Sequence, residues 1–146
     1  MAHESDHPPL REARRQARSF EKVREAHQRE VAEDYVELIA DLIASHGEAR
    51  VVDLAERLGV TSATVNNTLQ RLVAQGLVRK ERYRSIFLTE DGETIAEESR
   101  HRHRLVVALL LQLGVDAETA ETDAEGVEHH ISSKSLAAIE RFLNGS

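Results

Sequence analysis

The chain has 146 residues, of which 40% are hydrophobic and only 3% aromatic, so aliphatic side chains must supply most of its core. It contains no cysteine, and its single methionine is the first residue, which excludes disulfides, thiol catalysis and sulfur ligands for a metal. The net charge of −7 argues against a nucleic-acid partner for the whole molecule, but five basic residues and one acidic residue lie between Thr61 and Leu88. Such local positive charge is typical of a surface that binds phosphate.

The sequence has no apolar run long enough to cross a bilayer and no secretory signal pattern at its N-terminus. We therefore expect a cytoplasmic protein with no membrane partner. Residues 1–30 are expected to form an N-terminal extension that is partly disordered and partly helical. Its residues 10–29 are densely charged and carry a weak helical stripe of apolar residues, which either ends before the next helix or continues into it.

Residues 31–90 are predicted to form the first of two domains, a winged helix-turn-helix. Apolar residues recur at helical spacing from Val31 to Ile43, and Gly47 ends this first helix. A shorter second helix is predicted over residues 51–58, because its apolar residues repeat with the same period.

The third predicted helix follows a turn at Gly59 and ends at Gly76. Thr61 or Ser62 caps it, because a side-chain oxygen there accepts an unpaired amide hydrogen of the first turn. Two strand-like runs, at residues 77–80 and 85–88, then predict a β-hairpin wing. Four apolar residues of the third helix are expected to face the core: Val65, Leu69, Leu72 and Val73.

The turn, the cap, the polar face of the third helix and the basic hairpin together indicate a DNA-binding unit. Small hydrogen-bonding side chains at the start of that helix suit base edges in the major groove, and arginines at the wing tip suit phosphates or the minor groove. The alternative is an ordinary helical core with a solvated basic hairpin. The residues expected to contact DNA are Thr61, Ser62, Thr64, Asn67, Arg71, Arg82 and Arg84.

Residues 91–146 are predicted to form an all-helical domain, so the expected fold class is mainly α with one small hairpin. A long helix is expected over residues 93–113, with Gly114 after its end. Asp116 is expected to cap a second helix and Ser132 a last one. The apolar residues of the last helix that are expected to face inward are Leu136, Ile139, Phe142 and Leu143.

Two acidic clusters bracket the DNA-binding unit. Asp34 and Glu37 lie three residues apart on one face of the first helix, and Glu125, Glu128 and His129 are expected to converge within one helical turn. The second spacing is typical of metal ligands, but solvated acids on helix surfaces remain the alternative for both clusters. Neither zinc-peptidase pattern is present, and no nucleophile or general base lies outside the clusters. We therefore predict that the protein is not an enzyme.

With these features located, the chain resembles the diphtheria toxin repressor family of metal-dependent regulators, and within it the manganese transport regulators. The resemblance runs from about residue 33 to 142 and is most specific in Asp123-Ala124-Glu125-Gly126-Val127-Glu128-His129-His130. It implies a pair of divalent ions per subunit, and it selects His103 rather than His101 as a ligand, a choice that spacing alone leaves open. The ligands that the resemblance implies are Asp34, Glu37, His103, Glu125, Glu128 and His129.

Iron-responsive relatives place sulfur-containing or sulfur-derived ligands at the positions of Asp34 and Glu125, where this chain has carboxylates. Hard oxygen ligands with imidazole suit Mn²⁺. Together with these donors, the resemblance implies a homodimeric, Mn²⁺-responsive repressor that controls manganese uptake and binds double-stranded DNA at a palindromic operator. Rival predictions are a winged-helix repressor that responds to Fe²⁺ or to a small organic ligand. The dimer is expected to use the final helices and the apolar half of the long helix: Leu105, Val106, Leu109, Leu110 and Leu113.

Overall fold

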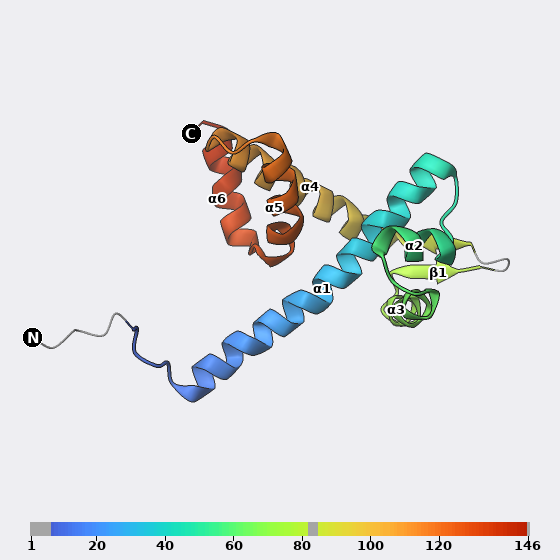
Figure 1. The fold of residues 1–146 in the computed structure, drawn as a ribbon, viewed down its shortest axis with the longest axis horizontal. Helices are drawn as coiled ribbons and strands as arrows, with labels where there is room; N and C mark the ends of the chain where they lie inside the picture. The colour runs from blue at the N-terminus through green and yellow to red at the C-terminus, as the bar shows by residue number, and fades with distance from the viewer. Residues whose placement is uncertain (1–6, 82–84, 146) are drawn as a thin grey trace, which may run out of the picture.

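The structure is a computed structural model that describes residues 7–81 and 85–145 (Figure 1). This part of the chain is mainly helical with one two-stranded hairpin, as predicted. None of the described helices is long and apolar enough to span a membrane. The elements are α1 Ala13–His46, α2 Val51–Leu58, α3 Ser62–Ala74, β1 Val78–Lys80, β2 Ile86–Leu88, α4 Glu90–Gln112, α5 Ala117–Val127, the 3₁₀ turn η2 Glu128–His130 and α6 Ser133–Leu143.

Helix α1 is a single helix of 34 residues that joins the predicted extension to the first helix of the winged helix-turn-helix. The apolar stripe of the extension therefore continues into the next helix. We call residues 13–29 the arm; it runs away from the rest of the molecule, and Ala26 is its one buried residue (Figure 1). The expected disordered start falls partly outside the described residues, and residues 7–12 form neither helix nor strand. At its other end α1 stops at Gly47, which adopts a left-handed conformation with φ 80°.

The second half of α1, together with α2, α3 and the hairpin, encloses one aliphatic core. Thr61 caps α3 by accepting a hydrogen bond from the amide of Thr64 at 3.1 Å. The two strands are antiparallel and pair Val78 with Leu88, and each is shorter than predicted. The residues at the centre of this core are Val36, Ile39, Leu54, Val65, Leu69 and Ile86.

One core prediction for α3 is wrong. Val73 is 44% exposed, because the buried stripe of the helix is centred on Val65, Leu69 and Leu72 and Val73 lies beyond its edge.

The C-terminal helices begin with α4, which starts at Glu90 rather than at the predicted residue 93. Thr89 caps the helix by accepting a hydrogen bond from the amide of Gly92 at 3.1 Å. Gly92 permits this start because a Cβ at that position would overlap the carbonyl oxygen of Leu77. Asp116 and Ser132 cap α5 and α6, as predicted.

Helix α6 differs from the prediction in its burial. No residue of α6 is buried within the subunit, and Phe142 is 52% exposed. The prediction that Phe142 faces inward is therefore wrong, because α6 packs on α4 by one side only.

Helices α1 and α4 pack together and connect two lobes. The winged-helix lobe consists of the second half of α1, α2, α3 and the hairpin, and the C-terminal lobe consists of the second half of α4, α5, η2 and α6 (Figure 1).

Candidate metal centre

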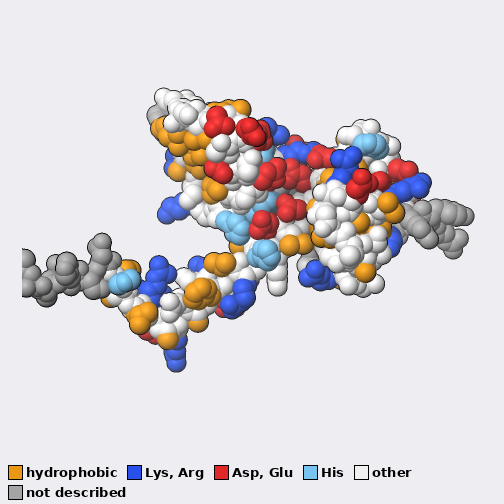
Figure 2. All heavy atoms as spheres, viewed as in Figure 1, with side chains coloured by type: hydrophobic (Ala, Val, Ile, Leu, Met, Phe, Trp, Pro, Cys, Tyr) orange, Lys and Arg blue, Asp and Glu red, His pale blue; other side chains and the backbone are white. Residues whose placement is uncertain are grey.

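Acidic side chains and histidines gather in the space between the two lobes (Figure 2). They come from α1, from α4 and from the consecutive elements α5 and η2, three parts of the chain that pack together here. All six predicted metal ligands lie on these four elements.

The second acidic cluster does not lie on one continuous α-helix, so the predicted convergence holds for Glu125 and Glu128 but is wrong for His129. Helix α5 ends at Val127, and the next three residues form the 3₁₀ turn η2. Each residue of a 3₁₀ turn advances by about 120° rather than 100°. His129 is therefore turned away from Glu125 and contacts α1.

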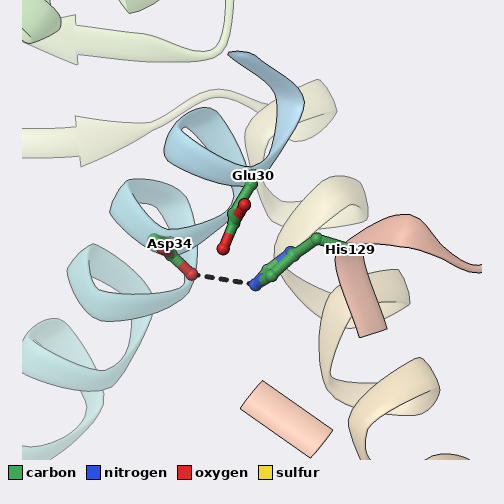
Figure 3. Close-up of side chains that lie close together, drawn as sticks. All are labelled: Glu30, Asp34 and His129. Carbon is green, nitrogen blue, oxygen red and sulfur yellow. Dashed lines mark ion pairs between the residues drawn. The ribbon is translucent and has the colours of Figure 1, made fainter. Parts of the chain in front are cut away.

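The first group of possible ligands consists of Glu30, Asp34 and His129 (Figure 3). One donor atom from each lies within 4.8 Å of the others. The Nε2 atom of His129 is 3.0 Å from Oδ1 of Asp34, although the two are not aligned as a hydrogen bond. Glu30 precedes Asp34 by one helical turn and was not predicted from the sequence.

The ring of His129 is held from behind by Glu33. Its Nδ1 atom lies 2.6 Å from Oε2 of Glu33, which in turn is 2.8 Å from the guanidinium of Arg102. Arg102 also donates from Nε to the backbone carbonyl of Glu128 at 3.1 Å. A carboxylate at Nδ1 fixes the tautomer of a histidine and leaves Nε2 free to bind a cation.

The second group consists of His103, Glu125 and Glu128. Nδ1 of His103 is 2.7 Å from Oε2 of Glu128 and 4.0 Å from Oε1 of Glu125. The other ring nitrogen, Nε2, is 2.7 Å from Oε2 of Glu121. Glu121 therefore contacts one ring nitrogen of His103, just as Glu33 contacts one ring nitrogen of His129.

Glu128 connects the two groups. Its side chain is 1% exposed, with Oε2 beside His103 and Oε1 3.3 Å from Nε2 of His129. This Oε1 atom and Nε2 of His129 are both buried without a hydrogen-bond partner. Leaving two such atoms unpaired costs free energy, and a cation between them would remove that cost. The donor set therefore fits a metal ion.

Glu37 lies beside the two groups without belonging to either. Its carboxylate accepts a hydrogen bond from the hydroxyl of Ser99, a fully buried residue of α4, at 3.0 Å. Burial raises the pKa of Glu37, and the negative charge of Glu125 raises it further. The structure thus brings five of the six predicted ligands into two groups and places the sixth within electrostatic range.

The concentration of carboxylates makes this site hold protons. Burial raises the pKa of Glu128 to about 7, although the neighbouring histidines oppose that shift. Burial alone would lower the pKa of His129, but its contacts with Asp34 and Glu33 raise it to about 10. The same balance raises the pKa of His103, because Glu121 and Glu128 outweigh its burial. Any cation that binds here must displace protons.

The predicted DNA contacts on α3 lie on its surface. Thr61, Ser62, Thr64, Asn67 and Arg71 are all exposed. The other two predicted contacts, Arg82 and Arg84, lie outside the described residues.

Sequence reasoning missed Glu30, Glu33 and Glu121. A signal for two of them was present, because the acids at positions 30, 33, 34 and 37 follow i, i+3, i+4 and i+7 spacing and share one helix face. Glu121 also lies four residues before Glu125 on α5, but its contact with His103 of α4 does not follow from that spacing.

Comparison with known proteins identifies the family of the chain. Residues 28–86 match the model of the iron dependent repressor N-terminal DNA binding domain, and residues 89–145 match the iron dependent repressor metal binding and dimerisation domain. The transcriptional regulator MntR of Escherichia coli O157:H7 is 54% identical over 123 residues, which cover 84% of this chain and 79% of that protein. The HTH-type transcriptional regulator MntR of Bacillus subtilis (strain 168) is 40% identical over 107 residues, covering 73% and 75%.

Among solved structures, a manganese-dependent transcriptional repressor in complex with manganese superposes with a TM-score of 0.70 at 31% identity. The match covers 79% of this chain and 53% of that one, so the chain spans about half the length of that structure. The manganese regulator SloR gives a TM-score of 0.69 at 27% identity, covering 79% of this chain and 54% of that one.

The two family models together match most of the chain, and they describe a DNA-binding domain followed by a metal-binding and dimerisation domain. The resemblance to the diphtheria toxin repressor family is thereby confirmed. The chain belongs to the iron dependent repressor family: it is a homodimeric, metal-dependent repressor of transcription that binds double-stranded DNA, and it is not an enzyme.

Proposed function

We propose that the effector of this repressor is Mn²⁺, with one ion at each of the two ligand groups of a subunit. The observation that carries the proposal is the position of Glu128, whose two oxygens face different groups. A buried carboxylate in that place can bridge two cations. The orphaned Nε2 atom of His129 supplies the imidazole ligand of one group, and Nδ1 of His103 supplies that of the other.

The chemistry of the donors favours manganese over softer ions. Every candidate ligand is a carboxylate oxygen or an imidazole nitrogen, and the chain has no cysteine and no methionine after its first residue. Hard oxygen donors suit Mn²⁺, and thiolate or thioether donors would favour softer ions. Four relatives from enteric bacteria share the name MntR, and one solved neighbour is manganese-dependent.

The ligands come from both lobes, so a cation bound at the site fixes the position of one lobe relative to the other. Asp34 and Glu37 lie on α1, whereas His103, Glu125 and Glu128 belong to the C-terminal helices. A bound divalent cation supplies the positive charge that offsets the repulsion among these carboxylates. The carboxylates then hold the lobes in one arrangement of a pre-existing ensemble, at a coupling free energy of about 1–3 kcal/mol.

We further propose that residues 31–90 act as the DNA-binding domain and residues 91–146 as the metal-binding and dimerisation domain. In the dimer, the fixed lobes place two α3 helices about 34–36 Å apart, the length of one turn of DNA. That spacing matches a palindromic operator. Because Mn²⁺ binds the repressor when manganese is sufficient, we propose that the repressor then switches off manganese uptake.

The test measures operator binding by fluorescence anisotropy, with a duplex selected from a random library by the Mn²⁺-loaded protein. Mn²⁺ should strengthen binding by about 5- to 150-fold in the wild type and not in Glu125→Ala. Glu118→Ala, which removes an exposed acid from the same helix, is the matched control and should respond as the wild type does. Equal affinity in all conditions would contradict metal control and leave DNA binding intact.

The same assay separates the rival effectors. Stronger activation by Fe²⁺ than by Mn²⁺ under anaerobic conditions would contradict the proposed selectivity. Asp34→Met should shift preference toward Fe²⁺ or Co²⁺ if ligand hardness governs the choice. Absence of any thermal shift with divalent ions would instead favour an organic effector.

A further inference from the structure

The arm carries a positive charge that lies almost entirely outside the two family models. It holds six basic and two acidic residues, in a chain whose net charge is −7. The family models begin at residue 28, so almost the whole arm precedes them. Its basic side chains are exposed, and none of them forms a side-chain hydrogen bond or ion pair with another described residue.

The basic residues of the arm are concentrated on one face. At 3.6 residues per turn, five of the six fall within an arc of about 100°. They extend over about 22 Å of the helix axis. Arg24 lies outside this arc, and the exposed Phe20 and Val23 lie on other sides of the helix. The members of this basic face are Arg14, Arg15, Arg18, Lys22 and Arg29.

The basic face is continuous with the DNA-binding unit. A groove of about 520 Å³ separates the arm from the C-terminal end of α3. Lys22 and Arg29 line it from the arm, and Gln75, the C-cap of α3, lines it from the other side. The basic face therefore begins beside the recognition helix and continues outward along the arm. Basic side chains also protrude along the arm in Figure 2.

We propose that the basic face of the arm binds the phosphate backbone of the DNA that flanks the segment covered by α3. The inference rests on DNA binding by the winged helix but not on the identity of the metal. Phosphates follow one another along a duplex with dense negative charge, and a row of unpaired cations on a helix complements it. These contacts carry no sequence information, so they strengthen binding to the operator and to non-specific DNA alike.

The test is the salt dependence of binding in the Mn²⁺-loaded full-length protein. Removing one phosphate contact lowers the slope of log K against log [salt] by about 0.9. Arg18→Gln should show that loss, whereas Arg24→Gln, which removes the same charge from another face of the arm, should not. The combined variant Arg14→Gln/Arg15→Gln/Arg18→Gln should lower the slope by about 2.7 and weaken binding at 0.1 M salt by about tenfold or more.

Two further measurements sharpen the test. The difference between the wild type and the combined variant should disappear on a duplex shortened to the segment that the two α3 helices cover. The ratio of affinities with and without Mn²⁺ should stay unchanged, which separates failure of this proposal from failure of the proposed effector.

An unchanged salt slope in the combined variant would overturn the proposal. If that variant instead dissociated into monomers more readily in sedimentation equilibrium, the arm would bind the second subunit rather than DNA.

Discussion

The two lobes of this repressor differ in how they are stabilised. In the winged-helix lobe and the first half of α4, one contiguous cluster of buried side chains reaches from Tyr35 to Ala96. Among the described residues in the remainder of the C-terminal half, the buried apolar ones are Val106, Ala120 and Ala124, and the buried polar ones include Glu128 and His129. The first lobe is therefore stabilised by its own core. The stability of the second lobe depends on further groups that cover its apolar surface and neutralise its buried charge.

The apolar surface of the C-terminal lobe indicates what covers it. Within the described subunit, several of its large aliphatic and aromatic side chains are about half exposed or more: Leu111, Leu113, Val127 and Phe142. The family model places dimerisation on this segment. These side chains therefore offer an apolar surface to a second subunit.

The largest expected effect comes from truncating the winged-helix core. Leu69 is 1% exposed, and Leu69→Ala should lower the free energy of unfolding by about 2–5 kcal/mol through lost burial and a cavity. Urea denaturation followed by circular dichroism measures the loss. Because this lobe has its own core, the loss should be the same with and without Mn²⁺. A loss that Mn²⁺ abolishes would contradict the independence of the two lobes.

The next largest effect is expected at Glu33, which orients His129. Glu33→Gln removes the charge behind the imidazole, and it should weaken Mn²⁺ binding by about 10- to 100-fold. Isothermal titration calorimetry checks this, with Glu118→Gln as a control of equal charge change. Unaltered affinity in Glu33→Gln would show that the contact at 2.6 Å does not position the ligand.

A smaller effect is expected at the dimer surface. Leu113 is 65% exposed in the subunit, so Leu113→Glu should leave the winged-helix fold intact. If the apolar half of α4 contacts the second subunit, the substitution should weaken dimerisation by about 1–2 kcal/mol. Sedimentation equilibrium measures the change, and an unaffected dimer would place the interface elsewhere on the lobe.

The smallest effect concerns pH. Folding raises the pKa of Glu128, so this group stabilises the metal-free fold at pH values below the ordinary pKa of a glutamate. That stabilisation is lost as the pH rises toward about 7. The raised pKa of His129 acts in the same direction, from about 6.5 up to about 10. The metal-free protein should therefore lose stability as pH rises, while Mn²⁺ affinity increases by about tenfold per pH unit for each proton displaced.

Thermal unfolding from pH 6 to 9, with and without Mn²⁺, shows this as a widening difference in Tm. Glu128→Gln should narrow the difference. A Tm difference that does not change with pH would mean that no protons are displaced at the site.

Local features of the fold were predictable from the sequence, whereas contacts between distant segments were not. Thr61, Asp116 and Ser132 cap helices because the signal lies within three residues. The role of Glu121 depends on α4 passing beside α5, and no spacing along one helix reveals that. The exposure of Phe142 depends on which side of α6 packs against α4, and the apolar pattern of a single helix does not reveal that side.

The metal site shows the same limit in finer detail. Spacing placed Glu125, Glu128 and His129 in one group, because it assumed that α5 continues. The helix ends at Val127, and the change to a 3₁₀ turn assigns His129 to the α1 side and Glu125 to the α4 side. Glu128 is left between them, and this break in the helix is what creates two groups instead of one.

The central claim is that metal binding fixes the winged-helix lobe relative to the C-terminal lobe. Because the chain has no cysteine, Glu56→Cys on the exposed side of α2 provides a single site per subunit for a fluorophore. Time-resolved energy transfer between the two subunits of the dimer then reports the distribution of distances between winged-helix lobes. We expect a broad distribution without metal and a narrow one with Mn²⁺, in the wild-type site but not in Glu128→Gln. A distribution of the same width with and without Mn²⁺ would contradict the claim.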